Sequence, residues 1–154
     1  MINNWCNENT HGKIPKILNL GDVDASTRLV LTNAIYFKGR WKTQFNKNLT
    51  KDEDFYITPD RKIKVPMMTP GGGFKEYPKF EYTETNELQA IEFPYEGDEI
   101  SMLIILPKKD LKEIEKTLTY EKIKKIKENL ISVPVELYLP RFKLETTYQL
   151  GDVF

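Results

Sequence analysis

Two residue types that catalytic sites commonly use are almost missing from this sequence. Among its 154 residues there is one cysteine, Cys6, and one histidine, His11. A lone cysteine excludes an intrachain disulfide and a metal centre built from several thiolates. Catalysis by a Ser-His-Asp or Cys-His set would have to use His11, which lies in the turn-like stretch NTHGK and is interpreted as a solvated loop residue.

The sequence also lacks an excess of charge and a long apolar run. Lysine and arginine together number 23, as do aspartate and glutamate, so the basic excess typical of nucleic-acid-binding proteins is missing. The longest apolar runs, around residues 29–37 and 102–106, are far shorter than the ~20 residues that cross a bilayer. We therefore predict neither nucleic acid nor a membrane as a partner. No basic and then apolar leader precedes the fold, so we expect no secretory signal in these residues.

Three short clusters could carry chemistry, and each has a simpler interpretation. Gly71–Gly73 could cradle a phosphate, but neither a Lys-Ser or Lys-Thr pair nor a helix start follows, which favours a turn. Asp52–Asp54 lack the spacing and the glycine of a calcium-binding loop, which favours a solvated connector. Glu92, Glu96 and Glu99 are not paired for acid and base catalysis. We predict no catalytic residue, no metal site and no cofactor, and we do not expect an enzyme.

Asn48-Leu49-Thr50 forms the triplet that accepts N-linked glycans. The triplet matters only if the chain passes through a secretory route that glycosylates proteins. The sequence alone leaves the modification of Asn48 open.

The strongest structural signal is the apolar stretch LVLTNAIYF at residues 29–37. Its apolar side chains occupy both parities of a strand, which predicts a strand in the middle of a sheet with both faces covered. Asn33 interrupts the stretch, and an unpaired carboxamide in such a strand costs about 1–3 kcal/mol. Its side chain is expected either to bond a neighbouring backbone group, which composition alone favours, or to pair with a polar residue of an adjacent strand. In the second case the bond would differ between two states of the sheet.

The N-terminal half contains further local signals. Ile2 and Trp5 lie one helical turn apart and predict a short helix that Gly12 ends. Residues 46–68 are interpreted as polar connectors around short strands, with a turn at Pro59 and Asp60, and residues 69–80 as a loop.

The C-terminal half predicts a hairpin, two helices and a last strand. Apolar runs at residues 87–95 and 99–107 flank a short connection with a glycine, which predicts a β-hairpin. Asp110 and Thr119 are predicted to cap two helices. Residues 133–145 alternate between apolar and polar side chains and predict one strand. The fold class is α+β, with mixed or antiparallel β-sheets and a few helices.

Several motifs, in order along the chain, are together more specific than any single pattern. NAIYFKGRW at residues 33–41 is followed by Phe45, Thr50 and Phe55. INNWCNENTHGKI precedes it at 2–14, and VPMM at 65–68, ELQAIEFPY at 87–95, SMLIILP at 101–107 and LYLPRFKLE at 137–145 follow it. In this order and spacing the chain resembles the serpin family over essentially its whole length.

The resemblance implies a partial serpin fold and an inhibitor that works as a spring. A serine protease cleaves an exposed reactive-centre loop, the loop inserts as a new strand in a large sheet, and the trapped acyl-enzyme is distorted. On this resemblance, residues 29–37 correspond to the third strand of that sheet. Asn33 corresponds to the shutter asparagine, whose partner is a histidine of the fifth strand. Trp41 corresponds to the breach tryptophan, and Arg141 to a breach cation that pairs with a hinge carboxylate.

On the same resemblance, residues 1–154 are expected to be the central portion of a single serpin domain, truncated at both ends. The reactive-centre loop would lie in a missing C-terminal segment, which is the expected partner of this chain, and the strand at 29–37 would lack neighbours. The chain alone is therefore predicted to be non-inhibitory, and its target protease is unspecified. The alternative is a stand-alone, non-inhibitory binding or self-associating β module with open strand edges. The family implies an extracellular location, and an intracellular one is left open.

Overall fold

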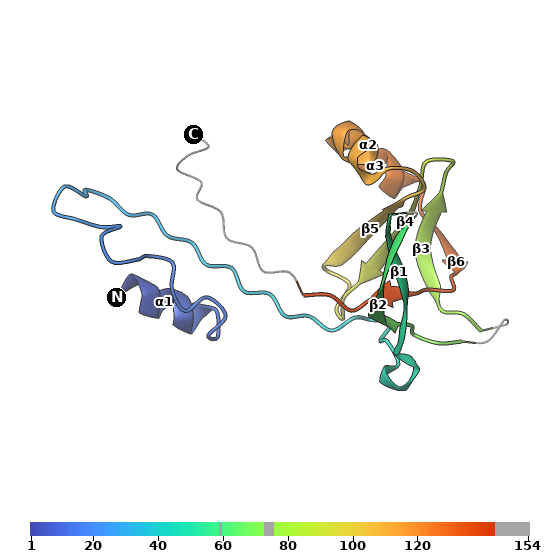
Figure 1. Ribbon diagram of the computed structural model, residues 1–154, viewed down its shortest axis with the longest axis horizontal. Helices are drawn as coiled ribbons and strands as arrows, with labels where there is room; N and C mark the ends of the chain where they lie inside the picture. Colours follow the sequence, from blue (N-terminus) through green and yellow to red (C-terminus); the bar gives the residue numbers. More distant parts are fainter. Residues whose placement is uncertain (59, 73–75, 144–154) are drawn as a thin grey trace. The chain divides into compact units, whose positions relative to one another are not determined.

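The computed structural model describes residues 1–58, 60–72 and 76–143, and it contains two compact units. The first unit is Met1–Gly39 and the second is Arg40–Phe154. The secondary structure combines short helices with antiparallel sheets (Figure 1), so the predicted α+β class is confirmed. Among the helices of the described residues, none combines the length and the apolar character that crossing a bilayer requires.

The first unit begins with the predicted helix, α1 (Ile2–Asn9). The helix ends because His11 and Gly12 both adopt left-handed conformations, with φ of 52° and 77°. The Gly12 N–H then donates to the Asn7 carbonyl at 2.8 Å and satisfies one of the last free carbonyls of the helix. The exposed imidazole of His11 stacks on Tyr36 with 4.6 Å between the ring centroids, which joins the end of α1 to the apolar stretch.

Residues 29–37 are extended but belong to no sheet in the described part of the chain. The prediction that both faces are covered is wrong, because Leu31 is 86% exposed and Ile35 is 78% exposed. A strand joins a sheet only when another strand satisfies its backbone N–H and C=O groups. The apolar pattern of residues 29–37 does not provide that second strand.

The second unit contains a four-stranded antiparallel sheet with the order β5-β4-β3-β6. Its strands are β3 (Lys79–Glu84), β4 (Leu88–Pro94), β5 (Ser101–Pro107) and β6 (Ile131–Pro134). The predicted β4–β5 hairpin is confirmed, with Pro94 and Pro107 at strand ends, where a missing N–H disrupts the ladder least. Strand β3 was not predicted, since its first residues were assigned to a loop.

Two helices follow the hairpin, α2 (Leu111–Thr117) and α3 (Tyr120–Glu128). Both begin at the predicted caps: the Asp110 carboxylate accepts the N–H two residues further on at 2.8 Å, and the Thr119 hydroxyl accepts the N–H three residues further on at 3.2 Å. The two helices lie together beside the β4–β5 hairpin (Figure 1).

Alternate side chains of β4 point to opposite faces of the four-stranded sheet, and both faces are covered. Leu88 and Ala90 pack against Ile114 of α2 and Ile126 of α3. Phe93, only 1% exposed, belongs to the cluster on the other face. The core of the second unit is therefore two apolar layers with β4 between them. Strand β4 is thus the central strand with both faces covered that the sequence predicted at residues 29–37.

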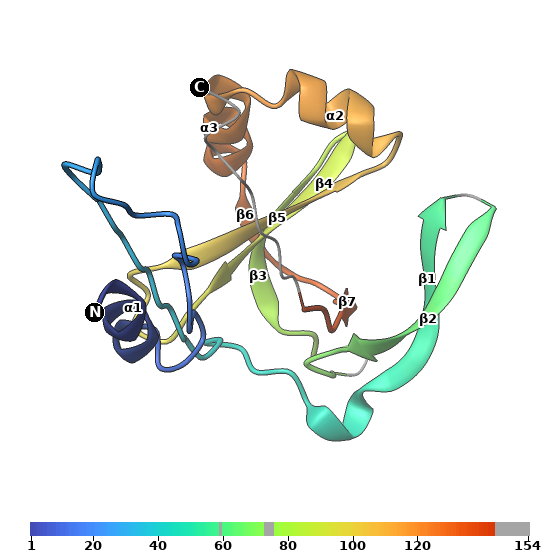
Figure 2. The same ribbon diagram turned by 60° about the vertical axis from the view of Figure 1, so that its left-hand side comes forward.

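A second sheet has the order β1-β2-β7. Strands β1 (Lys51–Thr58) and β2 (Arg61–Met68) form a long curved hairpin (Figure 2), and β7 (Leu139–Pro140) pairs with the end of β2. The predicted short strands in this region are thus two strands of eight residues. Pro59, half of the predicted turn, lies outside the described residues.

The single strand predicted for residues 133–145 is wrong. The segment divides into the end of β6, which pairs with β3, and β7, which pairs with β2 in the other sheet. Pro134 and Pro140 stand at the ends of these two pairings, and neither has an N–H that could continue a ladder. Alternation of apolar residues predicted extended backbone correctly but not the change of sheet. Residues 144 and 145 lie outside the described residues.

Candidate functional site

Trp41 is the best anchored of the three candidate residues. It forms a two-residue antiparallel bridge with Tyr95, directly after β4. The backbone hydrogen bonds on either side of the bridge measure 2.8 and 3.0 Å. The first residues of the second unit are thereby attached to the end of β4 in the same unit.

The indole of Trp41 closes an aromatic cluster. Its ring stacks on Tyr95 with 4.3 Å between centroids and meets Phe93 edge-on at 5.6 Å. Phe93 in turn packs against Phe80 at 4.8 Å. Each such aromatic pair contributes about 0.5–1.5 kcal/mol beyond the area it buries, so the position of Trp41 is fixed by packing. The sequence prediction named Trp41 but missed Tyr95 and Phe93, although the alternating aromatics of ELQAIEFPY are the signal for them.

An ion pair flanks this bridge without deciding its stability. The Lys42 ammonium lies 2.7 Å from the Asp98 carboxylate, and both side chains are more than half exposed. Exposed pairs of this kind contribute about 0–1 kcal/mol and are screened by salt. The aromatic contacts therefore dominate the attachment.

Asn33 lies in the first unit, within the extended stretch, and its side chain is exposed. Its carboxamide has no hydrogen-bond partner among the described residues. The expected bond to a neighbouring backbone group is therefore not formed, and water can satisfy the amide in its place. The desolvation cost expected for a covered strand does not arise.

Arg141 follows β7 and is exposed. Its backbone N–H donates to the Pro66 carbonyl at 2.8 Å, which extends the pairing of β7 with β2 by one bond. The guanidinium makes no ion pair within the described part of the chain. Trp41 and Arg141 thus stand at the ends of different sheets of the second unit, while Asn33 belongs to the first unit.

Glu92 is the charged residue within the buried strand β4. Its carboxylate accepts the Ser101 hydroxyl of β5 and lies 3.0 Å from the ammonium of Lys127 on α3. Both partners, the Ser101 hydroxyl first, favour the charged form and hold the pKa of Glu92 below its ordinary value. The carboxylate ties β4 to β5 and to α3, which is a structural role.

The acidic cluster Asp52–Asp54 lies in strand β1, so it is not a connector, although Asp52 and Glu53 are exposed to solvent as predicted. The Asp54 carboxylate lies 2.6 Å from Lys62 and 2.9 Å from Lys64 of β2. These two ammonium groups hold the pKa of Asp54 below its ordinary value. Asp54 thus takes part in a cross-strand charge pairing.

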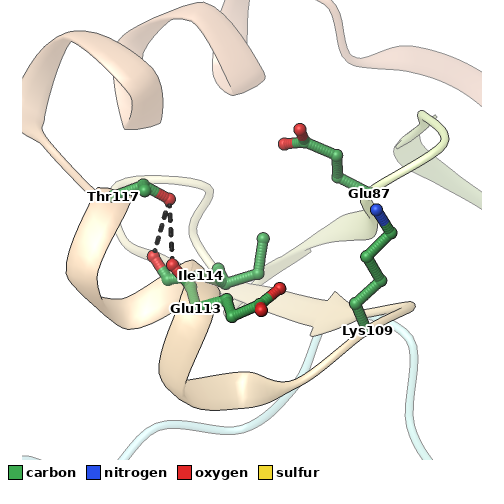
Figure 3. A pocket seen from close by; sticks show the side chains of 5 residues that line it. All are labelled: Glu87, Lys109, Glu113, Ile114 and Thr117. Atoms are coloured by element: carbon green, nitrogen blue, oxygen red, sulfur yellow. Dashed lines mark hydrogen bonds between the residues drawn. The ribbon is translucent and has the colours of Figure 1, made fainter.

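A shallow hollow of about 150 Å³ lies between the start of β4 and helix α2 (Figure 3). It is lined by Glu87, Lys109, Glu113, Ile114 and Thr117. The Thr117 hydroxyl turns back to its own helix and donates to the carbonyls of Glu113 and Ile114 at 3.3 and 3.1 Å. With its only hydroxyl engaged in this way, the hollow presents no nucleophile with a base, and the shape is that of a surface depression.

Comparison with known proteins agrees with the motifs along the chain. The family model described as "Serpin (serine protease inhibitor)" matches residues 1–154. Antichymotrypsin-2 of Bombyx mori is 42% identical over 157 residues, covering 99% of this chain and 40% of that protein. Leukocyte elastase inhibitor of Xenopus laevis is 43% identical over 155 residues, covering 97% of this chain and 40% of that protein.

The solved structures give the same result. Ovalbumin from emu (Dromaius novaehollandiae) matches with a TM-score of 0.89 and 32% identity, covering 99% of this chain and 39% of that chain. The cleaved viral serpin CrmA matches with a TM-score of 0.81 and 29% identity, covering 98% and 50%. The chain spans about 40% of the length of the curated relatives it matches. With a family match along its entire length, this chain belongs to the serpin family.

Proposed function

We propose that this chain is the central portion of a single serpin domain whose whole protein inhibits serine proteases, and that these residues alone do not inhibit. The observation that carries the proposal is the family match over residues 1–154, together with relatives named for the inhibition of chymotrypsin, trypsin and elastase. The expected partners are a serine protease for the whole protein and, for this chain, the remaining part of the serpin domain. The proposed role is not catalytic and uses no cofactor.

The extended stretch at residues 29–37 supports this proposal physically. Its backbone is already extended (Figure 1), and its side chains Leu29, Leu31 and Ile35 are exposed. An inserted strand would add sheet hydrogen bonds to this stretch and cover its exposed side chains.

A chimera tests the proposal most directly. Residues 1–154 would replace the matching segment of antichymotrypsin-2 of Bombyx mori, which is 42% identical. We expect the chimera, but not the 154-residue chain alone, to form a complex with chymotrypsin that survives denaturing electrophoresis. A folded chimera that the protease merely cleaves would contradict the inhibitory lineage, and a stable complex with the chain alone would contradict the non-inhibitory part.

We further propose that Asn33 and Trp41 act in the shutter and the breach, and that Arg141 is the breach cation. Within the chimera, Asn33→Ala, Trp41→Ala and Arg141→Ala are each expected to raise the fraction of inhibitor that is cleaved without a complex several-fold. Lys125→Ala, at an exposed position of α3, serves as the matched control. Partitioning that is unchanged from the control in all three variants would remove these roles.

We infer an extracellular location for the whole protein from the family resemblance, with an intracellular one as the competing outcome. Detection of the endogenous protein in culture medium or in the cell fraction distinguishes the two. The inhibitory proposal does not depend on which is found.

The open apolar stretch also supports a second candidate, a self-associating or partner-binding β module. Leu31 and Ile35 are exposed beside unpaired backbone, which is the composition of a strand edge that pairs with another chain. Sedimentation of the 154-residue chain is expected to show concentration-dependent oligomers. A monodisperse monomer that melts cooperatively would exclude this candidate.

A further inference from the structure

We propose that Asn48 is the acceptor of an N-linked oligosaccharide. Asn48-Leu49-Thr50 is the only Asn-X-Ser/Thr triplet in the sequence. It lies on the short 3₁₀ turn Lys47–Leu49 that leads into β1, where the side chain of Asn48 is exposed. The sequence left this site open, and the geometry of the turn favours its use.

The two asparagines of this turn have different tasks. The Asn46 side chain caps the turn by accepting the Asn48 N–H at 3.0 Å. The Asn48 carboxamide, in contrast, has no hydrogen-bond partner in the described residues. A glycan on the Asn48 Nδ2 atom would therefore break no side-chain hydrogen bond that holds the turn.

Leu49, the middle residue of the triplet, contacts Gly71 although its side chain is 39% exposed. Its side chain lies so close to Gly71 that a β-carbon at that glycine would be 2.7 Å from the Leu49 Cδ1 atom. The turn itself is closed by the Leu49 and Thr50 N–H groups, which donate to the Asn46 and Lys47 carbonyls at 3.0 and 3.3 Å. These bonds use backbone groups alone, so the exposed Asn48 side chain is free to carry a bulky modification.

The triplet lies next to an edge strand, β1, which the glycan would border. Within the described residues β1 is an edge strand of its sheet, and the turn projects at the foot of the β1–β2 hairpin (Figure 2). A bulky, hydrated glycan at this point stands beside the free edge of β1, where Phe55 and Tyr56 are exposed.

The reaction needs a donor of one class, an oligosaccharide linked to a membrane lipid through pyrophosphate. The Asn48 Nδ2 atom attacks C1 of the first sugar and forms the N–C1 bond. The C1–O bond to pyrophosphate breaks, and the lipid pyrophosphate leaves with the electron pair. Nδ2 loses one proton, so no oxidant or reductant is consumed. The membrane of the secretory route holds this donor and its oligosaccharyltransferase catalyses the transfer, so the inference rests on the extracellular location proposed above.

The test imposes the secretory route, so that it separates the site from the location. The 154-residue chain is expressed behind a secretion leader in eukaryotic cells, together with Asn48→Gln and Thr50→Val. The second variant removes the triplet but keeps the shape of the side chain. Intact mass before and after peptide N-glycosidase is measured, and a peptide map locates the aspartate that the enzyme leaves at a glycosylated asparagine.

We expect most of the secreted chain to carry one glycan, located at Asn48, and both variants to carry none. A secreted chain that is unmodified at Asn48 overturns the proposal. Ile131→Thr in the Asn48→Gln background provides a comparison site, because it creates the same Asn-Leu-Thr triplet at exposed Asn129, whose amide donates to the Lys125 carbonyl at 2.6 Å. If Asn129 in this variant is glycosylated while Asn48 in the wild-type chain is not, the turn at residues 47–49 is what prevents glycosylation of Asn48. An intracellular endogenous protein would contradict the proposed extracellular location but not the ability of Asn48 to accept a glycan.

Discussion

Residues 29–37 and strand β4 have similar apolar sequences but differ in burial and in strand pairing. In β4, Leu88 is 2% exposed and the strand has a hydrogen-bonded neighbour on each side. In the stretch at 29–37, Leu31 is 86% exposed and the described residues supply no neighbour. The comparison teaches that an apolar pattern specifies what a strand needs, whereas the rest of the chain decides whether the strand receives it.

Glu92 in β4 and Asn33 in residues 29–37 differ in the same way, because only one of them has neighbouring elements to bond in the described part of the chain. Glu92 of β4 has a hydroxyl from β5 and an ammonium from α3 as partners. Asn33 has no partner among the described residues and relies on water. A polar group within an apolar run thus forms hydrogen bonds to the protein only where neighbouring elements offer partners, and otherwise it bonds water.

Hydrogen exchange should show the largest difference between the two stretches. Amides of residues 29–37 are expected to exchange with almost no protection, because no sheet hydrogen bond must open. Amides of β4 are expected to require an opening free energy that approaches that of global unfolding of the second unit. Mass spectrometry of peptides from a deuterated chain measures both. Equal protection of the two stretches in a monomeric chain would break the comparison.

Leucine truncation should separate the stretches by a smaller but still large amount. Leu88→Ala removes a side chain buried against α2 and α3 and is expected to cost about 2–5 kcal/mol of unfolding free energy. Leu31→Ala, the matched control, is expected to change it by less than about 0.5 kcal/mol. Urea unfolding followed by Trp fluorescence provides the measurement. A cost at Leu31 comparable with that at Leu88 would mean that residues 29–37 are covered in solution.

Acid sensitivity should give the smallest difference, and its sign follows from Glu92. The pKa of Glu92 is lowered in the folded chain from an ordinary value of 4.5. Its stabilising contribution is therefore present above pH 4.5 and is lost as the pH falls through the lowered pKa. Glu92→Gln should weaken the dependence of unfolding free energy on pH in this acid window. Asn33→Ala should leave that dependence unchanged. Identical pH profiles for wild type and Glu92→Gln would show that the carboxylate has no net partner in solution.

Local signals predicted much of this fold correctly, because they act through neighbours in sequence. The caps at Asp110 and Thr119 and the β4–β5 hairpin all belong to this group. The missed strand β3 and the division of residues 131–140 between two sheets depend on partners far away in the chain. The same limit applies to the site: Trp41 could be named from its motif, but its stacking on Tyr95 depends on tertiary packing.

Strand β7 has a consequence for how the second unit assembles. Its two residues complete a sheet whose other strands lie far earlier in the chain. During synthesis the β1–β2 hairpin must therefore wait, as a two-stranded ribbon of marginal stability, until residues 139 and 140 have left the ribosome. Closing so long a loop is entropically slow, and the order of events along the growing chain makes this short strand the last of the described strands to pair.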